Sequence, residues 1–253
     1  MNVLRVLPRQ PGHPCAYLPQ RQAADRGFAV TSLSGAMWHE YLAQGYRRAG
    51  AMIYQPACAF CAECRPLRID VSRFRPGRTQ RRVLRTNADI EVSLGPVATD
   101  AEHAALYKRY ITMRHDGMMS GSERELVQFL GVSPVETQEI RYRLDGRLVG
   151  VGVTDVTPRG WSAVYCYFDP EMPKRSLGVL NVLQTVRLCR EMCPAGEKSK
   201  VYLGYWVKGS KTMGYKNAYR PHEVMEWGTG RWVETEESER AEASAVHGAG
   251  ASA

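Results

Sequence analysis

Apolar and polar residues recur along the chain with two periods, which separate predicted helices from predicted strands. The first helix is expected over residues 34–48, with Ser34 as its N-cap and Gly50 as its C-cap. The apolar residues that share one face of it are Trp38, Tyr41, Leu42 and Tyr46. Further on, residues 67–71 alternate between apolar and polar side chains, which predicts a strand.

The second half of the chain has a clearer pattern. The expected elements, in order, are helix 100–113, a short helix capped by Ser122, strands 139–144, 147–151 and 161–168, helix 177–192 and strand 200–207. Asp145-Gly146 between the first two of these strands predicts a type I′ hairpin turn. An antiparallel meander followed by a loop, a helix and a strand predicts an α/β (α+β) fold, in which helices flank a mixed, mostly antiparallel sheet.

We expect three segments. Residues 1–95 form an N-terminal half with a cysteine group and an arginine-rich segment, and residues 96–233 form a C-terminal domain around the meander. Residues 234–253 are rich in Ala, Glu, Ser and Gly, a composition typical of a disordered tail.

Composition narrows the class of protein. The chain has 253 residues, of which 44% are apolar, enough to bury a sizeable core. No apolar run approaches the roughly 18 residues that span a bilayer, and the first residues lack the apolar region of a signal peptide. We therefore expect a cytoplasmic protein with reduced cysteines and no membrane partner.

Positive charge is concentrated in one segment. The chain has a net charge of +8. The segment between positions 65 and 85 carries eight arginines against one acid, Asp70. They are Arg65, Arg68, Arg73, Arg75, Arg78, Arg81, Arg82 and Arg85. The planar guanidinium binds phosphate oxygens in pairs, so this cluster favours a phosphate-bearing partner, with a solvated surface strand as the alternative. No amphipathic helical period is seen there.

A second anion site is predicted at the start of helix 177–192. Lys174, Arg175 and Gly178 form a basic, glycine-containing turn, and a helix begins there with unpaired backbone N–H groups. The turn loosely resembles the pyrophosphate-binding turn of acyl-CoA N-acetyltransferases. An ordinary strand-to-helix connection is the alternative interpretation.

Four cysteines are candidate metal ligands. Cys58, Cys61 and Cys64 are spaced by two residues each, and Cys15 supplies a fourth thiol upstream. Four soft thiolates suit Zn²⁺ or an iron–sulfur cluster. The second half of a zinc ribbon is missing, so free thiols with a redox-sensing role are the alternative. For Cys166, Cys189 and Cys193, core packing is expected.

Two long motifs identify a family resemblance. Residues 54–68 (YQPACAFCAECRPLR) and 202–216 (YLGYWVKGSKTMGYK) resemble the aminoacyl-tRNA–protein transferases, above all their bacterial leucyl-transferring branch. Further segments that carry the resemblance are residues 15–19, 41–50, 110–119, 165–178 and 221–223. It therefore covers nearly the whole chain except the tail.

The resemblance implies both a fold and a reaction. The fold is acetyltransferase-like (GNAT-type), and the reaction moves leucine from Leu-tRNA, or arginine in eukaryotic relatives, to proteins that begin with Asp or Glu. The product carries a degradation signal (the N-end rule). In eukaryotic relatives, cysteines in the region that Cys15, Cys58, Cys61 and Cys64 match bind an iron–sulfur cluster.

Candidate roles follow from this chemistry. The residues expected at tRNA phosphates are Arg78, Arg81, Arg82, Lys174 and Arg175. The cations expected to recognise the acidic side chain of the acceptor are Arg114, His115, Lys208, Lys211 and Lys216. Tyr165 and Asp169 are expected to orient the amine or relay its proton, and His115 is a candidate base. An aminoacyl ester is already activated, so no covalent nucleophile is required.

Three other functions are compatible with the sequence. Arginyl transfer by the same mechanism is one, because the sequence shows no physical feature that selects leucine. A non-catalytic RNA-binding protein is the second, since basic segments alone bind nucleic acid. The third is an acetyl-CoA N-acetyltransferase, although the turn before helix 177–192 lacks the run of glycines that lets backbone approach a pyrophosphate.

Overall fold

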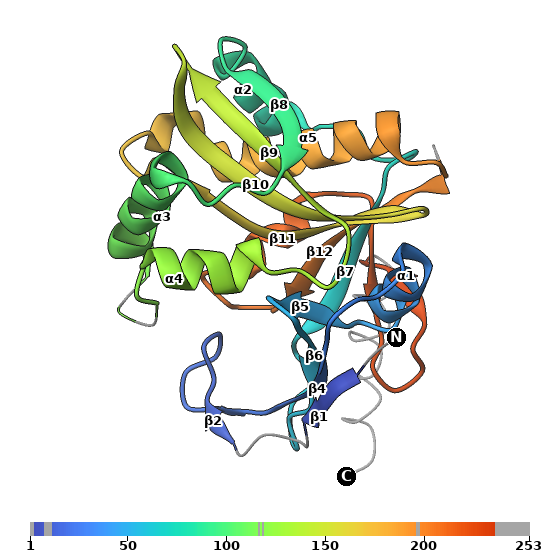
Figure 1. The fold of residues 1–253 in the computed structure, drawn as a ribbon. Helices are drawn as coiled ribbons and strands as arrows, with labels where there is room; N and C mark the ends of the chain where they lie inside the picture. The colour runs from blue at the N-terminus through green and yellow to red at the C-terminus, as the bar shows by residue number, and fades with distance from the viewer. Residues whose placement is uncertain (1–2, 8–11, 116, 118, 196–197, 236–253) are drawn as a thin grey trace.

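A computed structural model describes residues 3–7, 12–115, 117, 119–195 and 198–235, so most of the expected tail lies outside the described residues. An eight-stranded sheet forms its centre (Figure 1). In spatial order its strands are β14 (Trp232–Glu234), β13 (His222–Met225), β7 (Arg65–Asp70), β12 (Lys200–Trp206), β11 (Gly160–Phe168), β10 (Arg147–Thr157), β9 (Thr137–Leu144) and β8 (Glu91–Pro96).

All neighbouring strands in this sheet are antiparallel except β11 and β12, which run parallel. The hairpin between β9 and β10 turns at Asp145 and Gly146, with φ of +50° and +77°. Two successive positive φ values define the type I′ turn, so this prediction is confirmed. Residues before and after the expected boundary at 95–96 contribute strands to the one sheet.

Helices cover both faces of the sheet (Figure 1). They are α2 (Arg78–Thr86) and α5 (Leu177–Met192) on one face, and α3 (Ala101–Arg114) and α4 (Glu123–Leu126) on the other. The chain order is strand β8, two helices, three antiparallel strands, helix α5 and the parallel strand β12. The expected α/β fold, with its mostly antiparallel sheet flanked by helices, is confirmed.

The N-terminal residues form a smaller layer below the sheet in Figure 1. It holds a four-stranded sheet, a two-stranded ribbon and one helix. Their bounds are β1 (Val3–Leu7), β4 (Asp25–Val30), β6 (Met52–Pro56) and β5 (Arg47–Ala49) in the sheet, β2 (His13–Pro14) and β3 (Gln22–Ala23) in the ribbon, and α1 (Gly35–Ala43). Trp38, Leu42 and Ile53 of this layer pack with Tyr202 of β12.

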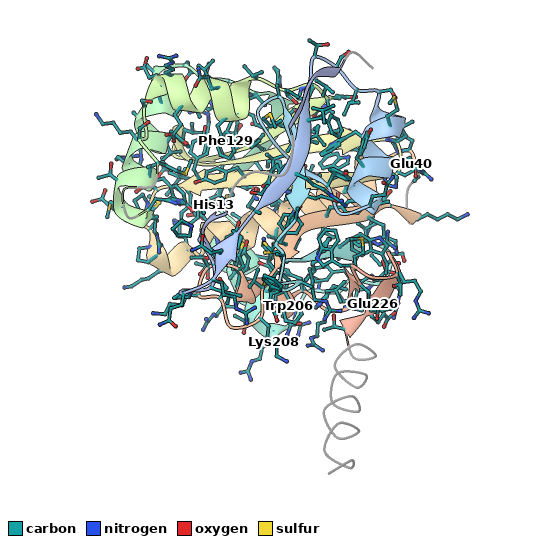
Figure 2. The ribbon with its side chains drawn as sticks, turned by 90° about the horizontal axis from the view of Figure 1, so that it is seen from below. His13, Glu40, Phe129, Trp206, Lys208 and Glu226 are labelled. Atoms are coloured by element: carbon teal, nitrogen blue, oxygen red, sulfur yellow. The ribbon has the colours of Figure 1, made fainter. Side chains whose placement is uncertain are left out.

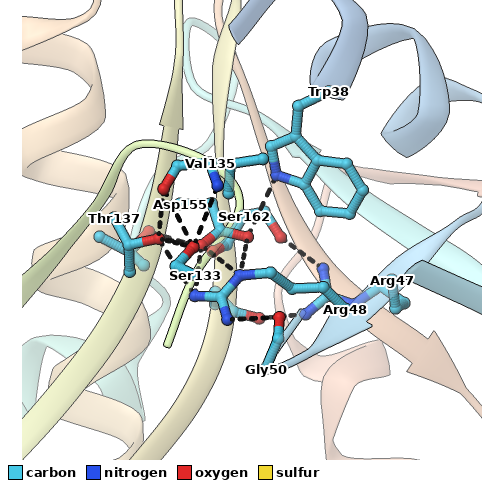
Figure 3. Close-up of polar contacts among 11 residues, drawn as sticks. Trp38, Arg47, Arg48, Gly50, Ser133, Val135, Thr137, Asp155 and Ser162 are labelled. Atoms are coloured by element: carbon cyan, nitrogen blue, oxygen red, sulfur yellow. Dashed lines mark hydrogen bonds and ion pairs between the residues drawn. The ribbon is translucent and has the colours of Figure 1, made fainter. Parts of the chain in front are cut away.

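A buried ion pair joins the two layers (Figure 3). Arg48 of β5 contacts Asp155 of β10, with 2.7 Å between Nη2 and Oδ1, and both side chains are fully buried. Trp38 Nε1 and Thr137 Oγ1 also donate hydrogen bonds to the Asp155 carboxylate, at 3.1 and 2.9 Å. Arg48 Nε also donates to Oδ1 and Oδ2, at 2.8 and 3.0 Å, so four donors surround this carboxylate and offset the cost of burying its charge.

The predicted helix 34–48 is too long. Ser34 caps α1 as expected, but the helix ends at Ala43, and Gly50 is not its C-cap. Gly45 turns the chain with φ of +85°, and the residues that follow form β5. Pairing of β5 with β6 outweighs the helical pattern, which is a tertiary effect that a local pattern cannot show.

The arginine-rich segment contains a helix that the sequence analysis did not predict. Gly77 is the N-cap of α2, and the Gln80 side chain accepts a hydrogen bond from its N–H at 2.8 Å. Gln80 and Val83 face the protein, whereas the arginines face solvent. With only one buried apolar residue in nine, the helical period was too weak to detect. The helices at 100–113 and 177–192 match α3 and α5 to within one residue.

Candidate active site

The parallel strands β11 and β12 diverge, and this opens the sheet. They pair only over residues 160–162 and 200–202. Just beyond, the register of β12 shifts near Gly204, which has φ of +79°, and the register of β11 shifts opposite Val153 and Thr154. Backbone groups of β11 beyond residue 162 therefore have no partner in β12 and are available to side chains or substrate.

Two of the three predicted catalytic residues are in direct contact beside this opening. The Tyr165 hydroxyl lies 3.0 Å from Nε2 of His115, the C-cap of α3, and 3.8 Å from Met119 Sδ. Tyr110 and Phe129 pack edge-on against the Tyr165 ring. Burial raises the pKa of Tyr165, so its phenol keeps its proton and acts as a hydrogen-bonding group.

Asp169, the third predicted catalytic residue, is held by two cations. It is 1% exposed, and its Oδ2 lies 2.8 Å from Arg147 Nη1 and 3.7 Å from Arg109 Nη2. Its Oδ1 accepts a hydrogen bond from the Glu171 backbone N–H at 3.1 Å. These contacts fix the chain as it leaves β11, so the structure shows Asp169 ordering the turn toward α5.

The basic turn before α5 is attached to the arginine helix. Arg175 makes a bidentate contact with Asp89: Nη1 donates to Oδ1 and Nη2 donates to Oδ2, both at 2.8 Å. Lys174 is exposed, and Gly178 lies in the first turn of α5. A Cβ at Gly178 would lie 3.3 Å from the Phe168 ring, so only glycine fits there without displacing that ring.

The expected phosphate-binding residues of α2 lie next to this turn. Asn87, the C-cap of α2, donates a hydrogen bond from Nδ2 to the Arg175 carbonyl at 2.8 Å. Arg78, Arg81 and Arg82 are exposed, and within the described part of the chain none of the three is in an ion pair. The structure thus brings the two predicted anion sites together on one surface, which we call the α2 surface: Arg78, Arg81, Arg82 and Lys174.

The cations expected to read the acidic side chain come from two places. Arg114, at the end of α3 beside His115, is exposed and lies 5.8 Å from the centroid of the Phe168 ring. Lys208 and Lys211 are exposed in the segment after β12, and Figure 2 shows Lys208 at the outer edge of the molecule.

Lys216, from the same segment, is buried. It is 7% exposed and donates a hydrogen bond from Nζ to the Tyr205 carbonyl at 2.8 Å. The neighbouring Arg47, 8% exposed, donates from Nη1 to Ser162 Oγ at 2.6 Å and from Nη2 to the Ala163 carbonyl. Burial, and then the charge of Arg47, lower the pKa of Lys216 to about 7. The apolar pattern predicted Arg47 to lie inside a helix, so its buried position in β5 was not foreseen.

The four predicted cysteines line one cavity. It has a volume of about 420 Å³, lies in the N-terminal layer and reaches Tyr205 of β12. The cysteines that line it are Cys15, Cys58, Cys61 and Cys64. Its other walls include Tyr17, Met52 and Tyr54, so much of the surface is apolar.

The surroundings of the thiols suit a metal only in part. The Leu18 and Ala24 backbone N–H groups donate to Cys15 and Cys58 at 3.4 and 3.5 Å, and Arg21 donates to Cys61 at 3.2 Å. Such donors stabilise thiolates. However, in the described residues no three His, Cys, Asp or Glu side chains are placed to hold a metal ion together. Of the other cysteines, Cys189 and Cys193 are buried in the core as expected, and Cys166 is half-buried.

The site combines a mixed sheet in which β11 and β12 separate, a contact between His115 and Tyr165, and an exposed basic surface at α2. Comparison with known proteins gives the family. Models of the N-terminal and C-terminal parts of arginine-tRNA-protein transferase match residues 13–82 and 102–226. The chain belongs to this family of aminoacyl-tRNA–protein transferases.

Curated relatives are similar over nearly their whole length. The aspartate/glutamate leucyltransferase of Chromobacterium violaceum is 39% identical over 87% of this chain and 90% of its own. That of Alcanivorax borkumensis is 38% identical over 94% of this chain and 96% of its own. Among solved structures, FemX superposes with a TM-score of 0.48 at 9% identity, over 78% of this chain and 68% of its own. In the described part of the chain, no helix is long and apolar enough to cross a membrane.

Proposed function

We propose that the protein transfers leucine from Leu-tRNA to the α-amine of proteins that begin with Asp or Glu, and so marks them for degradation in the cytoplasm. The observation that carries this proposal is the similarity to the aspartate/glutamate leucyltransferases of Chromobacterium violaceum and Alcanivorax borkumensis, across 90% and 96% of their length. The family supplies the two substrates, a charged tRNA and a protein.

The residues at the opening suffice for direct aminolysis. The acceptor nitrogen attacks the ester carbonyl of leucyl-tRNA, the new C–N bond forms, and the C–O bond to the terminal ribose breaks. His115 takes the proton that the amine loses, and the neutral Tyr165 phenol, hydrogen-bonded to His115, fixes the imidazole. The His115 imidazolium returns this proton to the departing ribose oxygen, so that uncharged tRNA is released and the histidine is neutral again.

The α2 surface supplies the tRNA contacts. Its cations are exposed and unpaired within the described residues, so they meet phosphates without first breaking an ion pair. Contacts to phosphate position the nucleic acid but do not read its sequence. Arg175 is already paired with Asp89, so we assign it to holding the turn against α2.

For the cysteine cavity we propose a thiolate-bound cofactor, either an iron–sulfur cluster or Zn²⁺. The shared cavity and the N–H donors at Cys15 and Cys58 support this proposal. Anaerobically purified protein should contain iron with sulfide, or zinc, in stoichiometric amount, and Cys58→Ser with Cys61→Ser should lose it. Metal-free protein with full activity and reversible disulfide formation would favour redox-sensing thiols instead.

The test of the proposed function is a transfer assay. Purified protein is incubated with radiolabelled Leu-tRNA or Arg-tRNA and peptides that begin with Asp, Glu or Ala. We expect label from Leu-tRNA on the Asp and Glu peptides only. Label from Arg-tRNA would show arginyl transfer, the alternative that the name of the family model favours. Binding of tRNA without any transfer would show a non-catalytic RNA-binding protein.

A further inference from the structure

One aromatic side chain in the segment that follows β12 is exposed. Tyr215 is 52% exposed, whereas the other tyrosines of residues 202–219 are buried. They are Tyr202, Tyr205 and Tyr219, which are 2–6% exposed. Isolated exposed apolar residues are common, so the exposure of Tyr215 acquires a meaning only from what surrounds it.

The Tyr215 ring is held in place and carries no charge. It packs edge-on against Tyr219, with 6.4 Å between ring centroids, and Lys216 Nζ lies 5.9 Å from its centroid. Tyr219 in turn packs against Phe74, which is buried in the core. Desolvation raises the pKa of the Tyr215 phenol to about 12, so the ring stays neutral and does not repel an anionic partner. An ordered, neutral ring binds another flat ring with little loss of conformational freedom.

The segment that carries Tyr215 is attached to α2. Tyr215 lies in a short 3-10 helix, η4 (Gly214–Ala218). Gln80 of α2 donates a hydrogen bond from Nε2 to the Ala218 carbonyl at 3.1 Å. Lys211, four residues before Tyr215, is exposed and forms no ion pair within the described part of the chain. The exposed ring thus shares one basic region of the molecule with the arginines of α2.

Tyr215 also lies near the proposed reaction centre. Burial raises the pKa of Tyr110, and the nearby phenol of Tyr215 raises it further. Tyr110 packs against His115 and Tyr165, with 5.8 and 6.3 Å between ring centroids. An exposed aromatic side chain therefore lies within reach of both the α2 surface and the His115–Tyr165 contact.

An aminoacyl-tRNA has matching parts in the same order. The phosphates of its backbone lead to an unpaired 3′ end, whose last nucleoside carries the aminoacyl ester on its ribose. Bases of unpaired nucleotides stack on aromatic side chains, and cations near the ring hold the adjoining phosphates. We propose that Tyr215 stacks against the terminal base of the tRNA and thereby positions the ester beside His115. This inference rests on the proposed function only for its donor, an aminoacyl-tRNA, and holds for a leucyl or an arginyl group alike.

Binding of uncharged tRNA tests this inference without the transfer reaction. Wild-type protein and the Tyr215→Ala variant are each titrated with intact tRNA and with tRNA whose last nucleotide lacks its base. Loss of that base should weaken binding to wild-type protein about 5- to 150-fold, the usual effect of one base stacked on an aromatic side chain. It should not weaken binding to Tyr215→Ala, because the stacking partner is already absent. Tyr215→Phe, which keeps the ring, should behave like wild-type protein.

Transfer kinetics give a second readout. Tyr215→Ala should lower kcat/KM for Leu-tRNA and leave KM for the acceptor peptide unchanged, since the ring contacts only the donor. Met192→Ala is the matched control, because Met192 is 54% exposed and lies at the opposite end of α5 from Gly178. This control should leave both values unchanged. A higher KM for the peptide in Tyr215→Ala, with kcat/KM for Leu-tRNA unchanged, would assign the ring to the acceptor and overturn the inference.

The inference and the proposed function fail in distinguishable ways. If loss of the terminal base weakens binding equally in wild-type protein and in Tyr215→Ala, the ring does not stack on that base, whatever the transfer assay shows. Because each comparison is made within one protein sample, a smaller folded fraction in the variant cancels. Wild-type protein that shows the expected difference in binding but transfers no leucine would overturn the proposed function and leave the stacking of Tyr215 standing.

Discussion

At the scale of single residues, the proposed reaction depends on the Tyr165–His115 contact. We predict that His115→Ala lowers the rate of leucyl transfer about 10²- to 10⁴-fold, the usual contribution of a positioned base. The hydrogen bond at 3.0 Å then has no partner on the histidine side. Single-turnover transfer with saturating substrates measures the effect, and unchanged circular dichroism shows that the fold is intact. A full rate in this variant would remove His115 from the mechanism.

Tyr165 should matter less than His115. The raised pKa of its phenol excludes a role as base, so Tyr165→Phe removes only a hydrogen bond that orients the imidazole. We predict about a tenfold loss of rate, the value of one hydrogen bond of roughly 1.4 kcal/mol, with no change in the shape of the pH–rate profile. If the alkaline limb of that profile shifted, Tyr165 would be a titrating group and the assignment would be wrong.

Asp155 is the residue on which the contact between the two layers depends. Replacing it by Ala leaves Arg48 buried without a partner and should destabilise the fold by about 3–5 kcal/mol. The exposed pair of Arg159 and Glu40 is the control, because Arg159→Ala should cost less than about 1 kcal/mol. Urea unfolding measures both. Equal losses would mean that burial does not set the value of these pairs.

His115 and Tyr165 were candidates because each belongs to a segment that resembles the family. Their contact, between residues 50 positions apart along the chain, is seen only in the structure. The environment of Arg47 comes from Ala163 and Lys216, more than 100 residues away along the chain. No spacing pattern contains that information.

At the scale of elements, α2 is the predicted tRNA contact. Replacing Arg81 and Arg82 by Ala should weaken tRNA binding and flatten the dependence of log Kd on log salt by about 2, since two phosphate contacts are lost. Arg124→Ala with Arg159→Ala removes the same charge from exposed positions outside the α2 surface and should leave the slope unchanged. A slope that fell equally in both double variants would show that only net charge matters.

Helix α3 and strand β9 are joined by a titratable contact. His103, 2% exposed, lies between Asp100 and Glu139, at 2.7 and 3.0 Å. Burial alone would lower its pKa, but these carboxylates outweigh burial and raise it. Protonated His103 therefore stabilises the fold below the unfolded value of about 6.5, and this is lost as pH rises through the folded pKa. His103→Gln should lower Tm more at pH 6 than at pH 9, and an equal loss would contradict this.

Elements with a strong local signal were predictable, and those defined by pairing were not. The β9–β10 hairpin and α5 follow from a turn dipeptide and a long apolar period. In contrast, α2 buries mainly Gln80 and Val83, and β5 is only three residues long, held by β6. Their conformations depend on neighbours that come from elsewhere in the chain.

At the scale of the whole molecule, we propose that tRNA and the acceptor protein approach the opening between β11 and β12 from different layers of the fold. The α2 surface adjoins the turn that leads from β11 into α5, and the cysteine cavity reaches β12 at Tyr205. In this proposal the ester and the amine react because they are held close together, without a covalent intermediate.

The most direct test of this account is mass spectrometry of both protein and peptide during one turnover with Leu-tRNA and an Asp peptide. We predict that the peptide gains one leucyl group at its α-amine while the enzyme mass stays unchanged at every time point. A leucyl group on the enzyme before the peptide is modified, or equal modification of an Ala peptide, would contradict direct transfer to acidic N-termini.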